Sequence, residues 1–146
     1  MNNTFKIHTF DKKKYQFKEL IQNLYNEENL EKIHITKPDL LPNGILDFSN
    51  EAHTQFHKIF YKKLNQSWPN FFKIYNNFIK FEITKLIDEP FIYQYTPSFR
   101  VHLPNDQAIH KWHYDSDKDH NHPDGEINLC IAITEMKNTT AIWAET

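Results

Sequence analysis

The hydrophobic pattern of this sequence changes its period at Pro90, and this change is the strongest constraint on the fold. Before Pro90, apolar residues recur three and four positions apart, as they do along the buried face of an α-helix. After Pro90, apolar and polar residues alternate, as they do in a β-strand with one buried face. Helices followed by several closely spaced strands predict an α+β fold, in which the helices pack outside a β-sandwich or barrel.

Three amphipathic helices are predicted in the first part, of which the first should cover residues 12–26. Residues that favour the start of a helix precede the three predicted helices: Asp11, then Ser49 or Asn50, then Ser67 with Pro69 in the first turn. The apolar stripes comprise Phe17, Leu20, Ile21 and Leu24 in the first helix, Ala52, Phe56, Ile59, Phe60 and Leu64 in the second, and Phe71 or Phe72, Tyr75, Phe78 or Ile79, Ile83 and Leu86 in the third. We expect the aromatic side chains of these stripes to form the core.

Strands are predicted where apolar and polar residues alternate. In the second part these are residues 91–95, 99–103, 112–115, 126–134 and 140–145. Two further short strands are predicted at residues 1–10 and 32–35, the second of them within a loop of residues 27–48.

Length and composition narrow the class of protein. The 146 residues are enough for one domain with a real core, so we expect a single domain over residues 1–146. The formal net charge of -2 gives no strong field, and no segment resembles a signal peptide or a membrane span. Cys130 is the single cysteine, so no internal disulfide can form and a reducing compartment is expected. We therefore predict a cytoplasmic protein with no nucleic-acid partner and no membrane partner.

His113 and Asp115 carry the clearest chemical signal in the sequence. Side chains two apart on a strand lie on the same face, so an imidazole and a carboxylate would be presented side by side. Two histidines and one carboxylate on one face suit non-haem Fe(II), and this pair supplies two of those three ligands. The other interpretation is a structural His–Asp hydrogen-bonded pair. A Cys/His zinc site is not indicated, because Cys130 has no second thiol to join it.

Residues 94–146 resemble the Fe(II)- and 2-oxoglutarate-dependent oxygenases, in particular the bacterial and phage group similar to a streptomycin-biosynthesis oxygenase. Several separate motifs, in the same order along the sequence as in that group, support this resemblance. Pro-Ser-Phe-Arg-Val-His-Leu-Pro at residues 97–104 leads to the His113-x-Asp115 motif, and Gly-Glu-Ile-Asn at residues 125–128 follows it. Residues 139–145 match a Thr-Asn-x-x-Trp-x-Glu strand, with Thr140 where this group usually has Asn.

The resemblance implies a double-stranded β-helix, a jelly-roll of cupin-like shape, whose interior holds metal, cosubstrate and substrate. It implies that His113 and Asp115 are catalytic Fe(II) ligands. In the family, a distal His and an Arg that pairs with 2-oxoglutarate follow later, and neither has a counterpart before Thr146. We therefore expect an N-terminal fragment whose β-helix is incomplete at the C-terminus. Residues 1–90 would be mainly helical support, and residues 91–146 would form the first half of the β-helix.

The expected function is that of a dioxygenase that hydroxylates an unknown small molecule, with Fe(II) as cofactor and 2-oxoglutarate as cosubstrate. The 146-residue chain alone is expected to be inactive. Arg100 and His102 share a strand face and could contact cosubstrate or substrate, whereas the alternative for Arg100 is a solvent-facing strand residue. Asn128, or Glu126, could accept the second ring N–H of a metal-bound His, and the alternative is an ordinary turn residue.

Two other functions are compatible with the sequence. A non-catalytic cupin-like module could bind a small ligand in the same interior without redox chemistry. It would have a natural end near Thr146, or a continuation without the distal His and the Arg. A helical interaction protein with an accessory β segment fits less well, because nothing in the predicted helices exceeds ordinary amphipathicity.

Overall fold

Helices account for the regular structure of the chain where it is described. The computed structural model describes residues 6–41, 54–103, 118, 122–123, 125–138 and 141. The α-helices among these residues are α1 (Phe17–Tyr25), α2 (Ile33–Thr36), α3 (Gln55–Asn65) and α4 (Pro69–Phe81). Three 3-10 turns accompany them: η1 (Leu30–Lys32), η2 (Pro38–Leu40) and η4 (Ile83–Lys85).

Helix α1 confirms the first predicted stripe but begins later than predicted. Phe17, Ile21 and Tyr25, four residues apart, are buried on one face. The Asp11 carboxylate accepts hydrogen bonds from the backbone N–H groups of Lys13 and Lys14, at 2.9 and 3.2 Å, and closes a turn before the helix. Asp11 therefore caps this turn rather than α1. The helix ends at Asn26, whose φ of 49° is the left-handed conformation common after a helix.

Helix α3 is capped by Thr54, whose hydroxyl accepts a hydrogen bond from the backbone N–H of His57. The buried side chains Phe56, Phe60 and Leu64 confirm the second predicted stripe. Of the residues predicted at the start of this helix, Ser49, Asn50 and Ala52 lie outside the described residues.

Helix α4 begins at Pro69, in the first turn as predicted, with Trp68 at the N-cap position. Ser67 is not the cap: its φ is 80°, and it lies in the corner between α3 and α4. Phe71, Tyr75 and Phe78 are buried along α4, and Ile83 continues the buried face through η4. Leu86, predicted as the last member of this stripe, is exposed.

The core is largely aromatic, as the stripes predicted. Its buried hydrophobic members are Tyr15, Phe17, Ile21, Tyr25, Leu30, Ile33, Phe56, Phe60, Leu64, Trp68, Phe71, Tyr75, Phe78 and Ile83. Phe78 illustrates the packing, since its ring lies edge-on to Phe10, Tyr15 and Phe17 at centroid distances of 5.0, 5.2 and 5.4 Å. Edge-to-face contacts of this kind stabilise a core beyond the apolar area they bury.

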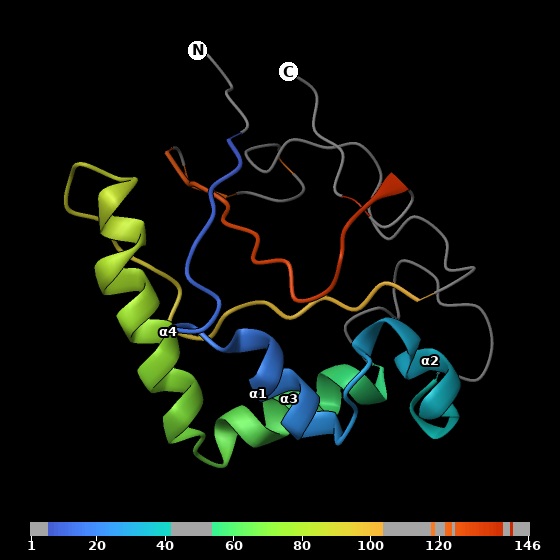
Figure 1. Cartoon of the computed structure of the whole chain (residues 1–146). Helices are drawn as coiled ribbons and strands as arrows, with labels where there is room; N and C mark the ends of the chain where they lie inside the picture. The colour runs from blue at the N-terminus through green and yellow to red at the C-terminus, as the bar shows by residue number, and fades with distance from the viewer. Residues whose placement is uncertain are drawn as a thin grey trace.

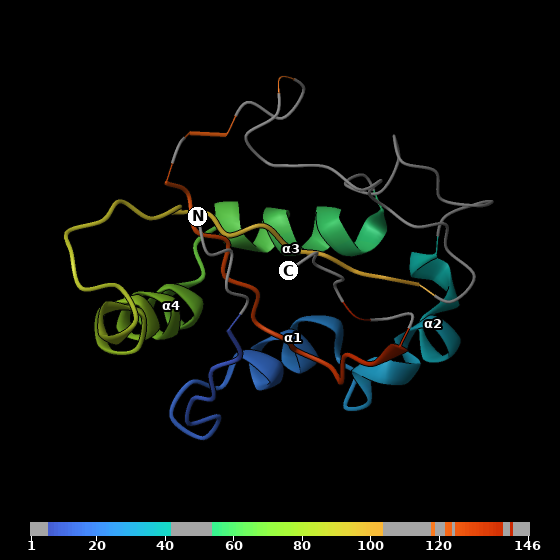
Figure 2. The same ribbon diagram turned by 90° about the horizontal axis from the view of Figure 1, so that it is seen from above.

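Two extended segments lie over the helical layer. Figures 1 and 2 show residues 91–103 crossing from α4 along α3, and residues 125–138 passing over the same side of the helices nearer to α1. Phe91 and then every second residue from Phe99, namely Phe99, Val101 and Leu103, pack against the helical core in the first segment, and Ile131 and Ile133 do so in the second. Over residues 99–103, the alternation that indicated a strand therefore sets which side chains contact the helices.

The predicted double-stranded β-helix, with its jelly-roll and cupin-like shape, is wrong for the part of the chain that the structure describes, where no residue is in a strand. Residues 91–95, 99–103 and 126–134 are neither helical nor paired in a ladder, and residues 32–35 are helical, in η1 and α2. Alternation of apolar and polar residues indicates only that one side of a segment is buried. A layer of helices can bury that side without a neighbouring strand. The predicted strand at residues 112–115 lies outside the described residues, as does that at 140–145 except for Ala141.

Candidate functional site

The two proposed metal ligands, His113 and Asp115, lie outside the described residues, so their role stays a prediction. Among the residues that are described, no three or more His, Cys, Asp or Glu side chains gather closely enough to hold a metal ion. The described residues therefore do not by themselves form a complete metal site.

Arg100 and His102 lie on the face of the first extended segment that points away from the helices. Both side chains are exposed, whereas Phe99, Val101 and Leu103 between and beside them are partly buried against the helical core. In an extended backbone this alternation turns Arg100 and His102 to the same side. That shared face was predicted, while their contact with cosubstrate or substrate stays a prediction.

Phe99 fixes this segment to α3. Its ring stacks on Phe60 with centroids 4.3 Å apart and planes 9° apart. Its backbone N–H donates a hydrogen bond of 3.0 Å to the Tyr61 hydroxyl. Tyr25 stacks at 6.4 Å, and His57 presents its ring at 5.9 Å and 66°. Arg100 thus follows directly after a residue that is held by both its backbone and its ring.

A buried polar pair lies under Phe99. Thr54 Oγ1 and His57 Nδ1 are 2.6 Å apart, and His57 is 1% exposed. The three-residue spacing is that of a helix N-cap and the residue that bonds back to it. This Thr-x-x-His spacing is visible in the sequence and could have identified the start of α3, although the predicted cap was placed earlier.

Asn128 lies in the second extended segment, after a turn. Gly125 has a φ of 83°, which a residue without a Cβ adopts at no steric cost, and Glu126 N donates to Pro123 O at 3.2 Å. The Glu126 carboxylate lies 2.8 Å from His122 Nδ1. Glu126 therefore has a histidine partner four residues before it, and Asn128 is exposed.

Two pockets of the described structure lie elsewhere. One of about 380 Å³ is lined by Leu24, Tyr25, Thr36, Lys37, Asp39, Leu40 and Ile59. Another of about 490 Å³ is lined by Asn76, Ile79, Lys80, Thr84, Glu89, Pro90, Phe91 and Tyr93. Neither includes Arg100, His102 or Asn128, so the residues proposed from the sequence do not line them.

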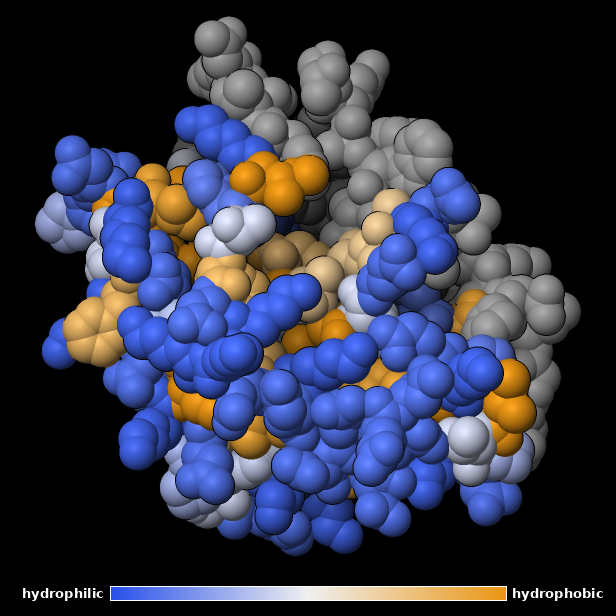
Figure 3. Space-filling view, viewed as in Figure 1, coloured by the Kyte–Doolittle hydropathy of each residue, from blue (hydrophilic) through white to orange (hydrophobic). Residues whose placement is uncertain are grey.

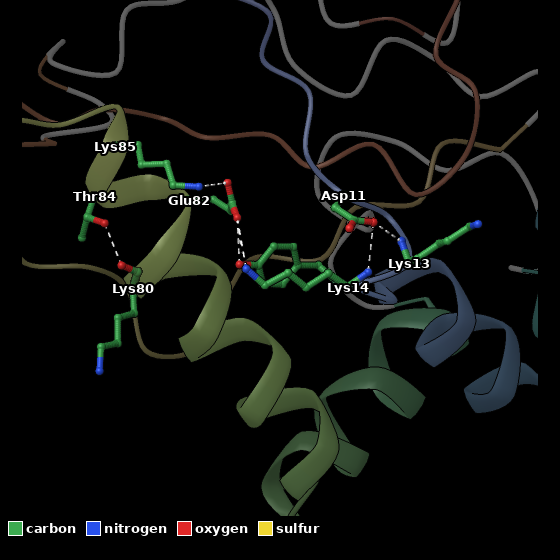
Figure 4. A network of polar contacts seen from close by, with 8 residues as sticks. Asp11, Lys13, Lys14, Lys80, Glu82, Thr84 and Lys85 are labelled. Atoms are coloured by element: carbon green, nitrogen blue, oxygen red, sulfur yellow. Dashed lines mark hydrogen bonds and ion pairs between the residues drawn. The ribbon is translucent and has the colours of Figure 1, made fainter.

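A network of hydrogen bonds and ion pairs surrounds Glu82 (Figure 4). Its carboxylate accepts hydrogen bonds from the Tyr15 hydroxyl at 2.9 Å and from Lys85 Nζ at 2.8 Å, and Lys14 Nζ lies 3.6 Å away. The bond from Lys85, followed by that from Tyr15, lowers the pKa of Glu82. The network joins the turn that precedes α1 to the end of α4, and its role is structural.

Hydrophilic side chains cover most of the lower half of the face in Figure 3, where the helices lie. In the part of the chain that the structure describes, no helix is long and apolar enough to cross a membrane. The exposed apolar side chains include Ile92, Ile127 and Leu129, all on the extended segments.

The comparisons with known proteins give one distant similarity. The chain is 24% identical to the streptomycin biosynthesis protein StrG of Streptomyces griseus over 127 residues, which cover 87% of this chain and 57% of StrG. The chain thus spans less than two thirds of the length of this relative. No family model matches the chain. No solved structure matches it either. Because 127 residues exceed the C-terminal third, the similarity extends into the helical part. It supports a distant link to the streptomycin-biosynthesis group.

Proposed function

We propose that this chain belongs to a non-haem Fe(II)- and 2-oxoglutarate-dependent dioxygenase that hydroxylates a small molecule. The observation that carries the proposal is the His113-x-Asp115 motif, set between residues 97–104 and Gly-Glu-Ile-Asn at 125–128 in the order of that family. StrG is named as a streptomycin biosynthesis protein, which is consistent with a small-molecule substrate.

The donor chemistry of the proposed ligands fits the metal. An imidazole nitrogen and a carboxylate oxygen are two of the three donors in the arrangement typical of non-haem Fe(II), and His113 and Asp115 would hold it. The third ligand has no residue assigned to it. Bound Fe(II), together with 2-oxoglutarate and O2, would supply the oxidation of a C–H bond.

Residues of the first extended segment would bind the cosubstrate. A guanidinium pairs with a carboxylate through two parallel hydrogen bonds, so Arg100 would orient a carboxylate of 2-oxoglutarate. His102, on the same face, would donate to a second oxygen. The Asn128 side-chain oxygen would accept a hydrogen bond from the ring N–H of His113 that does not bind the metal. This bond would fix the tautomer of His113.

The test uses the protein expressed from its complete natural reading frame. Asp115→Ala should abolish Fe(II)-dependent release of succinate from 2-oxoglutarate, because the metal loses its carboxylate ligand. Asp88→Ala, which removes an exposed carboxylate after η4, is the matched control and should retain turnover. Undiminished succinate release by the Asp115 variant would refute the metal assignment.

A second test uses the 146-residue chain by itself. With two assigned ligands, we expect weak Fe(II) binding and no turnover, measured by anaerobic calorimetry and by succinate assay. Robust turnover by this chain would contradict the assignment of only two ligands. Binding of 2-oxoglutarate by the complete protein without any turnover would instead favour a non-catalytic ligand-binding module.

A further inference from the structure

We propose that Tyr61 is a positioning residue for the carboxylate-binding face formed by Arg100 and His102. This inference rests on the proposed function, because it concerns how the chain holds the residues that would bind 2-oxoglutarate. Tyr61 lies on α3 and acts through Phe99, whose backbone N–H donates to its hydroxyl.

The hydroxyl of Tyr61 fixes the position of one backbone atom, Phe99 N. It accepts the hydrogen bond from Phe99 N, across 38 positions of sequence, in a partly buried setting. An extended segment outside a sheet lacks the ladder that normally fixes its register. A single side-chain acceptor on a helix can replace that ladder at one residue.

The aromatic rings around Phe99 fix the direction in which its side chain points. Tyr61 lies edge-on to Phe60 at 5.2 Å, and Phe60 stacks on Phe99 at 4.3 Å. The hydrogen bond holds the backbone of Phe99 while the stack holds its side chain toward α3. With both in place, the next residue must point away from the helices.

The consequence is a fixed outward direction for Arg100 and His102. A slip of one residue along α3 would turn both side chains into the helical core, since successive side chains of an extended backbone alternate in direction. A guanidinium binds a carboxylate bidentately only when it is correctly aimed. Tyr61 therefore contributes to cosubstrate affinity through the placement of Arg100.

The test compares Tyr61→Phe with Tyr75→Phe in the protein from its complete reading frame. Tyr75 is the matched control, because its hydroxyl also joins a helix to the following chain, by donating to Gln94 O at 2.6 Å, but it does so six positions before Arg100. Both variants keep the ring and lose one hydroxyl.

Two readouts separate positioning from general stability. In the metal-free protein, Tyr61→Phe should speed amide hydrogen exchange at Phe99 by about two- to tenfold, the range expected for one net hydrogen bond. In anaerobic Fe(II)-loaded protein, it should raise the Kd of 2-oxoglutarate by roughly three- to tenfold. Tyr75→Phe should leave both values unchanged while lowering the thermal midpoint to a similar extent.

The outcomes distinguish this inference from the proposed function. If Arg100→Ala leaves the Kd of 2-oxoglutarate unchanged while Asp115→Ala still abolishes turnover, the positioning inference is overturned and the oxygenase stands. The same holds if Tyr61→Phe speeds exchange at Phe99 without changing the Kd. If the unaltered protein binds no 2-oxoglutarate, the proposed function fails and the inference fails with it.

Discussion

Tyrosine hydroxyls hold together parts of this chain that are far apart in sequence. Tyr15 donates to Glu82 across 67 positions, and Tyr25 donates to the Phe56 carbonyl across 31. Burial raises the pKa of Tyr25, so its hydroxyl stays protonated and remains a donor at neutral pH. Neither Tyr15 nor Tyr25 belongs to a predicted apolar stripe, and the partner of a single hydroxyl depends on tertiary packing, so these two links could not be predicted from local sequence.

Glu82→Gln should reduce stability in a pH-dependent way. The Lys85 and Tyr15 hydrogen bonds lower the pKa of Glu82 below its ordinary value of about 4.5. A carboxylate with a lowered folded-state pKa stabilises the fold fully above its unfolded value, and that contribution is lost as the pH falls through the folded value. Thermal melting should therefore show the largest difference between the two proteins near pH 7, and the difference should shrink below about pH 4.5.

Glu89→Gln is the control for this prediction and should melt like the unaltered protein at both pH values. A difference between Glu82→Gln and the unaltered protein that stays constant down to pH 3 would show that the Glu82 charge contributes nothing.

The helices were predictable as elements because the evidence for them is local. Each apolar stripe repeats within one segment, and Phe17, Phe56 and Phe71 are all buried as their spacing required. The ends of the helices were less predictable, because a cap depends on one side chain and several candidates stand close together. Thr54, a few residues past the predicted caps, precedes α3.

Ser67→Gly should stabilise the corner between α3 and α4. Ser67 has a φ of 80°, and it follows the C-cap residue Gln66 at the position where helices commonly end in glycine. Relief of the left-handed strain should exceed the added flexibility of the unfolded chain, which gives a net gain of about 0.5–1 kcal/mol. Urea denaturation measures this gain. Ser67→Ala keeps the strain and should give none, and equal stability of the two variants would contradict the argument.

At the scale of the whole molecule, the second half of the fold could not be predicted from its pattern. Phe99, Val101 and Leu103 alternate in burial as a strand requires, yet their buried face meets helices. A strand is defined by a hydrogen-bonded neighbour, which is a non-local property. The same limit applies to the candidate site: the shared face of Arg100 and His102 followed from the period, whereas its direction away from the helices and the Tyr61 anchor did not.

The amides of residues 129–134 should exchange much faster than those of α3 and α4. Among the described residues this segment is extended outside any strand, whereas the helical amides are hydrogen-bonded within a buried layer. Exchange followed by mass spectrometry on overlapping peptides should show a difference of several orders of magnitude. Protection equal to that of α4 would mean that the segment is paired in a sheet in solution.

The contact of Phe99 with Phe60 also bears on how related chains can diverge. Two rings stacked at 4.3 Å fill one shared volume, so a change at one position alters which residues are tolerated at the other. Such positions change together in evolution: where one position takes a smaller side chain, a larger or differently shaped side chain at the other restores the packing. Substitutions 39 positions apart should therefore appear together in descent, and the pairing would mark α3 and the Arg100 segment as a single inherited unit.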